Sequence, residues 1–150
     1  MSWFNKRKKS NDKDDATWDY FYAELQGMEA SVRVDTKYKD AKYKHTYYVK
    51  LVYSSEPTTE LPDKYFLQDV YEIEKSLNYI ISNMTKGKIV YLGCATFGGS
   101  SYLIYASDEG YKWPEILTQV IEYEIEGGCY PNDNMGCYNT ILYPKEVRDK

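Results

Sequence analysis

The chain has 150 residues, enough for one domain that buries about 68–70% of the surface exposed by its unfolded form. Hydrophobic residues make up 43% of the sequence and 18 residues are tyrosines, a composition that allows a packed core and argues against a chain that is disordered throughout. The net charge of −4 combines +4 in the first ten residues with −8 elsewhere (15 basic and 23 acidic residues), and an acidic body argues against nucleic acid as a partner because it repels phosphates.

The chain opens with MSWFNKRKKS, and residues 1–17 are expected to form a disordered, solvated tail. Trp3 and Phe4 beside four cations would give at best a weak, reversible contact with an anionic membrane surface. The sequence has neither a signal-peptide pattern nor an apolar run of about 20 residues, so we expect a cytoplasmic location without stable membrane association.

Three strand patterns follow the tail. Residues 18–25 are rich in aromatic residues and residues 29–36 alternate apolar with polar side chains, which predicts an antiparallel hairpin with one solvated face. After a charged connector at residues 37–44, residues 45–54 form a strand pattern that is partly apolar on both faces. This strand is therefore expected to be covered on both sides.

Two helices are predicted. The first begins after Asp63, an N-cap residue, carries an apolar stripe at steps of three and four, and ends at Gly87. The second has Pro114 in its first turn and ends at the glycine pair Gly127-Gly128. The side chains expected to be buried on the second helix are Trp113, Leu117, Val120, Ile121 and Ile125.

The remaining strands complete the predicted order of elements. Residues 88–107 predict a hairpin that turns at Gly98-Gly99, because glycine adopts positive φ without a Cβ clash, and residues 138–143 predict a last strand. The resulting order is ββ–βαββαβ within a single domain of residues 18–147, followed by a charged tail at residues 148–150.

The last six predicted elements match a ferredoxin-like βαββαβ sandwich, an α+β fold. Both helices would lie on one face of a mainly antiparallel sheet, because each crossover is right-handed. The N-terminal hairpin would extend the sheet at an edge. How it docks stays open, since the strand at residues 45–54 cannot pair with this hairpin and also keep both ferredoxin-like neighbours.

The cysteines and the single histidine give no metal-site pattern. Cys94 lies in a strand pattern and is expected to be a small buried hydrophobic residue. Cys129 and Cys137 flank a turn-rich loop, and whether they approach each other is open. His45 follows a lysine-rich connector without a neighbouring nucleophile, so an exposed structural role is expected.

No other motif indicates catalysis or a bound cofactor. The glycines of residues 93–99 lead into a strand rather than a helix, unlike a phosphate-binding loop. Asp133 lies in the sequence PNDNMG, which lacks the ligand spacing of a calcium loop and predicts a turn. The many carboxylates are interpreted as a solvated acidic surface, and no catalytic, cofactor-binding or metal-binding residue is assigned.

Short motifs along most of the chain resemble the domain of unknown function 695 family. They are Trp18-Asp19-Tyr20-Phe21-Tyr22, Gly27, Ala30-Ser31, Val34-Asp35, Gly93-x-x-Thr96-x-Gly98, Tyr102 to Tyr105 and Leu142-Tyr143-Pro144. The resemblance covers about residues 18–147 and implies a bacterial, cytosolic protein with an α+β fold. Some members carry a neighbouring domain similar to the ferredoxin-like regulator of RNase E activity. Because the family has no assigned reaction, the resemblance supplies no catalytic residues.

The leading functional hypothesis is a non-enzymatic module, inhibitor-like or immunity-like, that binds a protein through an acidic, tyrosine-rich surface. The residues expected to form this surface are Trp18, Tyr20, Tyr22, Tyr48, Tyr102 and Tyr105. Two alternatives remain, a regulator of a ribonuclease or RNA-processing complex and an enzyme of unknown reaction. A homodimer formed through an open sheet edge is compatible with each of them.

Overall fold

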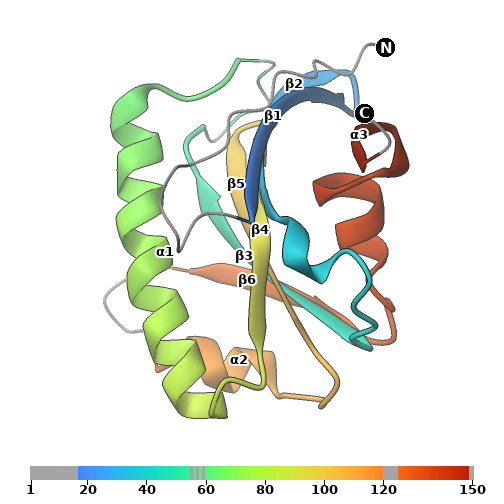
Figure 1. The fold of residues 1–150 in the computed structure, drawn as a ribbon. Helices are drawn as coiled ribbons and strands as arrows, with labels where there is room; N and C mark the ends of the chain where they lie inside the picture. Colours follow the sequence, from blue (N-terminus) through green and yellow to red (C-terminus); the bar gives the residue numbers. More distant parts are fainter. Residues whose placement is uncertain (1–16, 55, 57, 59, 120–124, 149–150) are drawn as a thin grey trace.

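The computed structural model describes residues 17–54, 56, 58, 60–119 and 125–148. These residues form an α+β domain in which helices lie on both faces of one open antiparallel sheet (Figure 1). The strands are β1 (Trp18–Leu25), β2 (Met28–Asp35), β3 (His45–Val52), β4 (Val90–Phe97), β5 (Ser100–Ser107) and β6 (Glu126–Tyr130). The helices are α1 (Lys64–Thr85), α2 (Trp113–Leu117) and α3 (Lys145–Arg148), with a 3₁₀ turn η2 (Thr36–Tyr38) and a π-helical turn η3 (Tyr138–Leu142).

The strand order β1-β2-β4-β5-β3-β6 answers how the N-terminal hairpin docks. β2 pairs with β4, with Val32 opposite Ala95, and not with β3, the strand that follows it in the chain. Because residues 36–44 carry the chain past β4 and β5, β3 keeps β5 on one side and β6 on the other. The predicted hairpin at β4 and β5 is confirmed, and both turn glycines have positive φ.

The helix α1 has the predicted start and the predicted buried stripe. Asp63 is its N-cap, and the carboxylate accepts a hydrogen bond from the backbone N–H of Phe66 at 3.0 Å. The buried side chains recur at steps of three and four: Val70, Glu74, Leu77, Ile81 and Thr85. The helix ends where Lys86 and Gly87 both adopt left-handed backbone angles.

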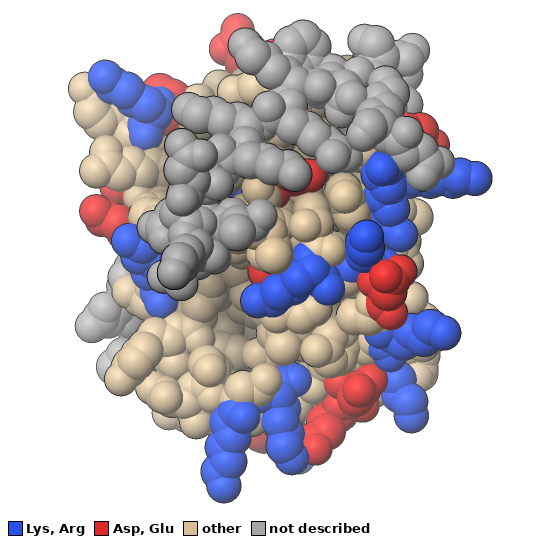
Figure 2. Space-filling model, viewed as in Figure 1, with Lys and Arg blue, Asp and Glu red and all other residues tan. Residues whose placement is uncertain are grey.

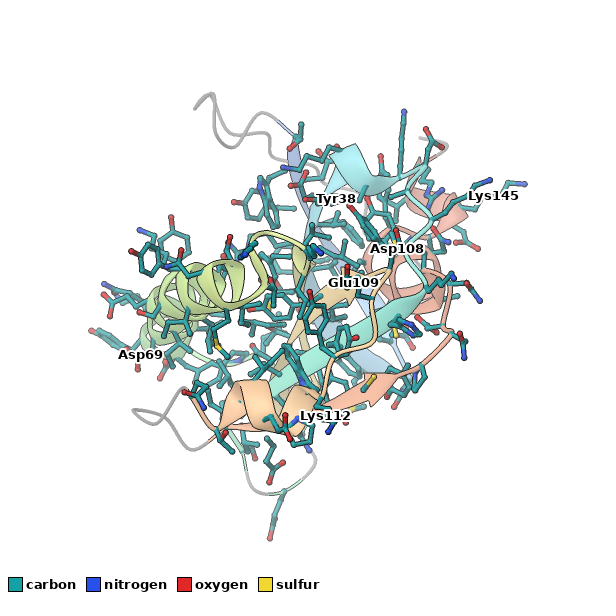
Figure 3. All side chains as sticks on the ribbon, turned by 90° about the horizontal axis from the view of Figure 1, so that it is seen from below. Tyr38, Asp69, Asp108, Glu109, Lys112 and Lys145 are labelled. Carbon is teal, nitrogen blue, oxygen red and sulfur yellow. The ribbon has the colours of Figure 1, made fainter. Side chains whose placement is uncertain are left out.

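The helices α1 and α2 cover the same face of the sheet, as expected from the right-handed crossovers. Their apolar side chains share one core cluster with the inward-facing residues of the central strands. The fully buried members include Tyr47, Val49, Leu77, Ile81, Leu103, Tyr105 and Trp113. Figure 3 shows this layering, with Asp69 on α1 at one side of the sheet and Lys145 on α3 at the other.

The opposite face is covered in part by a C-terminal helical segment, residues 136–148, so the prediction of a strand at residues 138–143 is wrong. Tyr138 and Leu142 are fully buried, whereas Thr140, which would share their face in a strand, is exposed, so the burial pattern is that of a helical segment. The Tyr138 hydroxyl donates a hydrogen bond to the Asp35 carbonyl at 2.7 Å. Short apolar runs such as YNTIL do not distinguish strand from helix by themselves.

The second predicted helix is also wrong in its extent. The helix α2 stops at Leu117, and β6 occupies Glu126–Tyr130, where the sequence suggested a helix end. A Cβ on Gly127 would lie 2.5 Å from the Tyr48 carbonyl oxygen and 2.9 Å from the Trp113 indole nitrogen. The glycine therefore permits close strand pairing rather than stopping a helix.

Some expectations fall outside the part of the chain that the structure describes. They concern the predicted tail up to residue 16, Val120 and Ile121 of the second predicted helix, and residues 149–150. Within the described part, no helix is both long and apolar enough to cross a membrane.

Candidate functional site

The six residues predicted to form one binding surface lie in three places. Trp18, Tyr20 and Tyr22 lie along β1 on the sheet face that carries α1, because they pair with the α1-facing positions of β2. Tyr48 and Tyr102 lie on the opposite face. Tyr105 is 1% exposed beneath α1 and is therefore not part of an open surface.

A charged pair lies between α1 and the strands beside it. The guanidinium of Arg33 on β2 forms an ion pair with the Glu74 carboxylate, and the Tyr91 hydroxyl donates a hydrogen bond to the same carboxylate at 2.7 Å. The Arg33 side chain is 18% exposed and the Glu74 side chain 8%. Both partners are thus largely removed from water. In such a low-dielectric environment charge-assisted hydrogen bonds are stronger than in water.

Two aromatic rings lie close to the Arg33 guanidinium. Its carbon lies 5.4 Å from the centre of the Trp18 ring and 5.6 Å from the centre of the Tyr71 ring, within the range of cation–π attraction. We refer to Trp18, Arg33, Tyr71, Glu74 and Tyr91 as the Arg33 cluster. Its cation contacts the Glu74 carboxylate and both of these rings.

The protonation states of the Arg33 cluster support this arrangement. Burial raises the pKa of the Tyr91 phenol well above its ordinary value, so the hydroxyl stays protonated and donates. Burial acts to lower the pKa of the Arg33 guanidinium, but its polar neighbours, Tyr91 first, outweigh burial and the pKa is raised. The cluster therefore keeps its cation and its neutral phenol throughout the physiological pH range.

Part of this region reaches the surface. Tyr22 on β1 is 46% exposed and Tyr71 on α1 is 45% exposed, while Trp18 and Tyr20 are half-buried. We call these four aromatic residues, three from one face of β1 and one from α1, the β1–α1 surface. Figure 2 shows basic and acidic side chains interspersed on one face of the molecule rather than a single acidic patch.

Beneath α1 and α2 the aromatic contacts continue into the core. Ring centres of Tyr91 and Tyr105 are 5.0 Å apart, and those of Tyr47 and Trp113 are also 5.0 Å apart. The buried hydroxyl of Tyr105 donates to the Asn78 side-chain oxygen at 2.7 Å, and the Trp113 indole donates to the Tyr48 carbonyl. These tyrosines are core residues with satisfied polar ends.

On the opposite face, four aromatic rings cross the sheet diagonally, one from each of β4, β5, β3 and β6. Successive ring centres lie 5.4 Å (Phe97 to Tyr102), 6.2 Å (Tyr102 to Tyr48) and 5.6 Å (Tyr48 to Tyr130) apart. We call this set the aromatic diagonal. A Cβ on Gly128 would lie 2.5 Å from the Tyr48 ring, so this glycine leaves room for the ring across β6.

The aromatic diagonal forms one side of a groove of about 310 Å³, with the C-terminal helical segment along its other side. The described residues that line the groove are Gln26, Thr46, Tyr48, Lys50, Ala95, Phe97, Tyr102, Ile104, Tyr130, Cys137 and Ile141. Among them Lys50 carries the only full charge. Burial and the neighbouring Asp133 carboxylate raise the pKa of the Cys137 thiol to about 12. This thiol is therefore uncharged where it lines the groove.

His45 and Asp133, which the sequence raised as candidate catalytic or metal-binding residues, form hydrogen bonds that hold loops and strands together. His45 accepts a hydrogen bond at Nδ1 from the backbone N–H of Asn132 at 3.1 Å. Asp133, in the predicted turn, accepts from the Thr46 hydroxyl and from the backbone N–H of Cys137, both at 2.8 Å. Within the described residues, no three His, Cys, Asp or Glu side chains are close enough to share a metal ion.

The three cysteines are free thiols. Cys94 is buried, which confirms the expectation from its strand pattern. Cys129 lies on β6 at the level of Tyr47 and is exposed, whereas Cys137 lines the groove on the opposite face. The pair left open by the sequence is therefore not a disulfide.

A second charged cluster lies in the loop after β5. Lys88 and Glu109 form an exposed ion pair at 2.8 Å, and the Lys88 ammonium lowers the pKa of the Glu109 carboxyl through this hydrogen bond. The backbone carbonyl of Glu109 also accepts from the Tyr47 hydroxyl at 3.0 Å. Figure 3 shows Asp108 and Glu109 side by side in this loop. Exposed pairs of this kind contribute little to stability and indicate no site.

The sequence reading missed the Arg33–Glu74 pair and the groove. One signal for the pair was present, because Glu74 is a carboxylate on the otherwise apolar stripe of α1, and Arg33 lies on the alternating polar face of β2. The groove had no such signal. It depends on the helical fold of residues 136–148 and on β6, both of which were predicted differently.

Comparison with known proteins identifies a family. A family model described as "Family of unknown function (DUF695)" matches residues 16–143. No curated protein and no solved structure gives a significant match to the chain. The match covers nearly all of the described domain, from the start of β1 to the end of the π-helical turn η3. The chain therefore belongs to the DUF695 family of unknown function.

Proposed function

We propose that this protein is a non-enzymatic protein-interaction module of the bacterial cytosol, and that its partner docks on the β1–α1 surface. The observation that carries this proposal is the Arg33 guanidinium in cation–π contact with Trp18 and Tyr71, on the same sheet face as Tyr22, which is about half exposed. Trp, Tyr and Arg are the residue types that dominate binding energy at protein interfaces.

Preorganisation adds to the case for a binding surface. The ion pair with Glu74 and the two flanking rings fix Arg33 before any partner arrives. Tyrosine and tryptophan have few rotatable bonds, so ordering them on binding costs little side-chain entropy. A surface assembled in this way from β1, β2 and α1 presents rigid aromatic anchors to a partner.

The proposed architecture of this module is a ferredoxin-like unit, β3–α1–β4–β5–α2–β6, extended by the hairpin β1–β2. The hydrogen-bonded order β4-β5-β3-β6 and the position of α1 and α2 on one face support this reading. In such a unit the added hairpin lengthens the sheet beyond α1, which leaves the β1 aromatics beside the helix rather than beneath it.

Site-specific photo-cross-linking in bacterial cells tests the proposal. A benzophenone side chain would replace Tyr22 or Tyr71 in two separate variants, and Tyr79, which is 73% exposed on α1, in a matched control. We expect one cross-linked protein from both Tyr22 and Tyr71 and none from Tyr79. Adducts of equal yield from all three positions, or none from Tyr22 and Tyr71, would contradict it.

The identity of the adduct separates the remaining alternatives. A ribonuclease or a subunit of an RNA-processing complex would place the protein among regulators of RNA processing. An adduct of twice the mass of the chain would identify a second copy as the partner, that is, a homodimer.

A further inference from the structure

The aromatic diagonal is arranged to receive a planar ring. Tyr48 and Tyr130 are stacked, with an interplanar angle of 25°, and Tyr130 is 50% exposed at the outer end of the row. The face of an exposed tyrosine ring can stack on a nucleobase, and such stacking stabilises binding for every type of base. The groove beside them, about 310 Å³, falls at the lower end of the size range of small-ligand sites.

A single cation lies next to these rings. Lys50 is two residues from Tyr48 along β3 and on the same face, which places the two Cα atoms about 6.7 Å apart. Tyr102 on β5 is the direct cross-strand neighbour of Lys50. Among the described residues, no carboxylate lies within ion-pair distance of the Lys50 ammonium.

We propose that this groove binds a purine nucleotide, with the base stacked on Tyr48 and Tyr130 and the phosphate paired with the Lys50 ammonium. Lys50 lies two residues from Tyr48 on the same face of β3 and directly opposite Tyr102, so one cation stands beside the rings. A nucleotide joins a planar base and a phosphate through a sugar, which lets one ligand make both contacts. Ammonium groups are well suited to phosphate as point charges.

Two further residues bear on ligand binding at this site. The side-chain amide of Gln26, in the turn between β1 and β2, lines the groove and offers both a donor and an acceptor to a base edge. Glu126 on β6 is the other cross-strand neighbour of Lys50; it forms no ion pair with it, but a carboxylate at this position is expected to disfavour a bound phosphate. The acidic body of the chain disfavours a long polyanion, but one phosphate on a local lysine is compatible with it.

This site lies on the sheet face opposite α1 and is independent of the β1–α1 surface, so either proposal can fail without the other. The test is calorimetric titration of the full chain with AMP, and in separate titrations with adenosine, ribose 5-phosphate and a single-stranded oligoadenylate. We expect saturable binding of AMP below about 1 mM and at least tenfold weaker binding of adenosine and of ribose 5-phosphate.

Variants assign the contacts. Lys50→Met is expected to weaken AMP binding about tenfold, since a charge-assisted contact to phosphate is lost. Tyr48→Leu removes a stacking ring and is expected to weaken it about tenfold as well. Glu126→Gln is expected to strengthen it, and Lys75→Met, on the exposed side of α1, is the matched control without effect. If Tyr48→Leu does not fold, Tyr130→Leu at the half-exposed end replaces it.

Absence of saturable AMP binding up to about 1 mM would overturn the proposal. Equal affinity for adenosine and AMP, or an unchanged affinity in Lys50→Met, would overturn the assignment of the phosphate. Binding of the oligoadenylate without binding of AMP would replace the proposal with a single-stranded nucleic-acid surface.

Discussion

The Glu74 carboxylate of α1 and the Arg33 guanidinium of β2 form an ion pair across the edge of the helix. β2 contributes no apolar residue to the core cluster beneath α1, so this pair is a polar link between α1 and the N-terminal hairpin. Tyr91 on β4 joins it by donating to the same carboxylate. The ion pair thus adds to the strand pairing and ring contacts that hold the β1–α1 surface in position.

Removing Glu74 alone is expected to destabilise the protein strongly. Glu74→Ala leaves the Arg33 charge largely buried without its partner, which costs about 3 kcal/mol of the free energy of unfolding. Chemical denaturation with urea measures this change. The double variant Arg33→Met/Glu74→Leu should be markedly more stable than Glu74→Ala, because no unpaired charge remains. If Glu74→Ala is as stable as the wild type, water solvates the Arg33 guanidinium in place of Glu74 at little cost in free energy, which would contradict this prediction.

The glycine pair of β6 is expected to be intolerant of side chains. Gly127→Ala places a Cβ 2.5 Å from the backbone oxygen of Tyr48, which cannot move without disrupting β3, so we expect a loss of about 1–3 kcal/mol. Gly110→Ala is the matched control, because nothing lies within 4 Å of its added Cβ. Thermal unfolding of the two variants gives the comparison. Equal stability of both would mean that β6 does not pair closely with β3.

Asp133 is expected to hold the start of the C-terminal helical segment. Asp133→Ala removes the acceptor for the Thr46 hydroxyl and for the Cys137 backbone N–H, at a cost of about 1–2 kcal/mol. Hydrogen exchange measured by mass spectrometry should show faster exchange in residues 136–142. Asp69→Ala, on the exposed side of α1, should leave exchange there unchanged. Unaltered exchange in Asp133→Ala would argue against the capping role.

The cysteines are expected to react with iodoacetamide in a defined order. The pKa of Cys137 is raised to about 12 by burial and by Asp133, so at pH 8 only about one thiol in 10⁴ is a reactive thiolate. Exposed Cys129 should react first, and Cys137 should speed up about tenfold per pH unit between pH 8 and 10. Mass spectrometry after timed alkylation distinguishes the sites. Equal rates at Cys129 and Cys137 would place Cys137 outside the groove wall.

The raised pKa of Cys137 also makes the stability of the protein depend on pH. The folded state holds the Cys137 proton up to a pKa of about 12, whereas the unfolded thiol loses it near its ordinary value. The contribution of Cys137 to stability is therefore complete below the unfolded pKa and is lost as pH rises toward 12. Cys137→Ala should reduce the loss of stability above pH 9.

The sequence predicted those elements whose local signals agree with their burial. α1 has both a cap residue and a stripe, and β4 and β5 are joined by a glycine turn that only a hairpin explains. The wrongly predicted elements lack a spacing of apolar residues that distinguishes a helix from a strand. Gly127-Gly128 is read equally well as a helix stop or as a close strand contact, and only the position of the Tyr48 carbonyl decides between them.

Strand alternation places two of the tyrosines on different faces, so they could not belong to the single predicted surface. Tyr102 and Tyr105 are three residues apart on β5, so they lie on opposite faces of the sheet. One lines the groove, and the other is sealed under α1 with its hydroxyl bound to Asn78. Tertiary packing decides which of the two faces of the sheet α1 covers. The sequence of β5 alone does not indicate that face.

The most direct test of the proposed interaction module is the affinity of the cross-linked partner, measured by calorimetry with purified proteins. Tyr22→Ala/Tyr71→Ala removes two anchors of the β1–α1 surface and is expected to weaken binding at least about 30-fold, equivalent to about 2 kcal/mol. The control Tyr65→Ala/Tyr79→Ala removes two exposed tyrosines of α1, 68% and 73% exposed, and should bind as the wild type does. Unchanged affinity in the first variant, or an equal loss in both, would contradict docking on the β1–α1 surface.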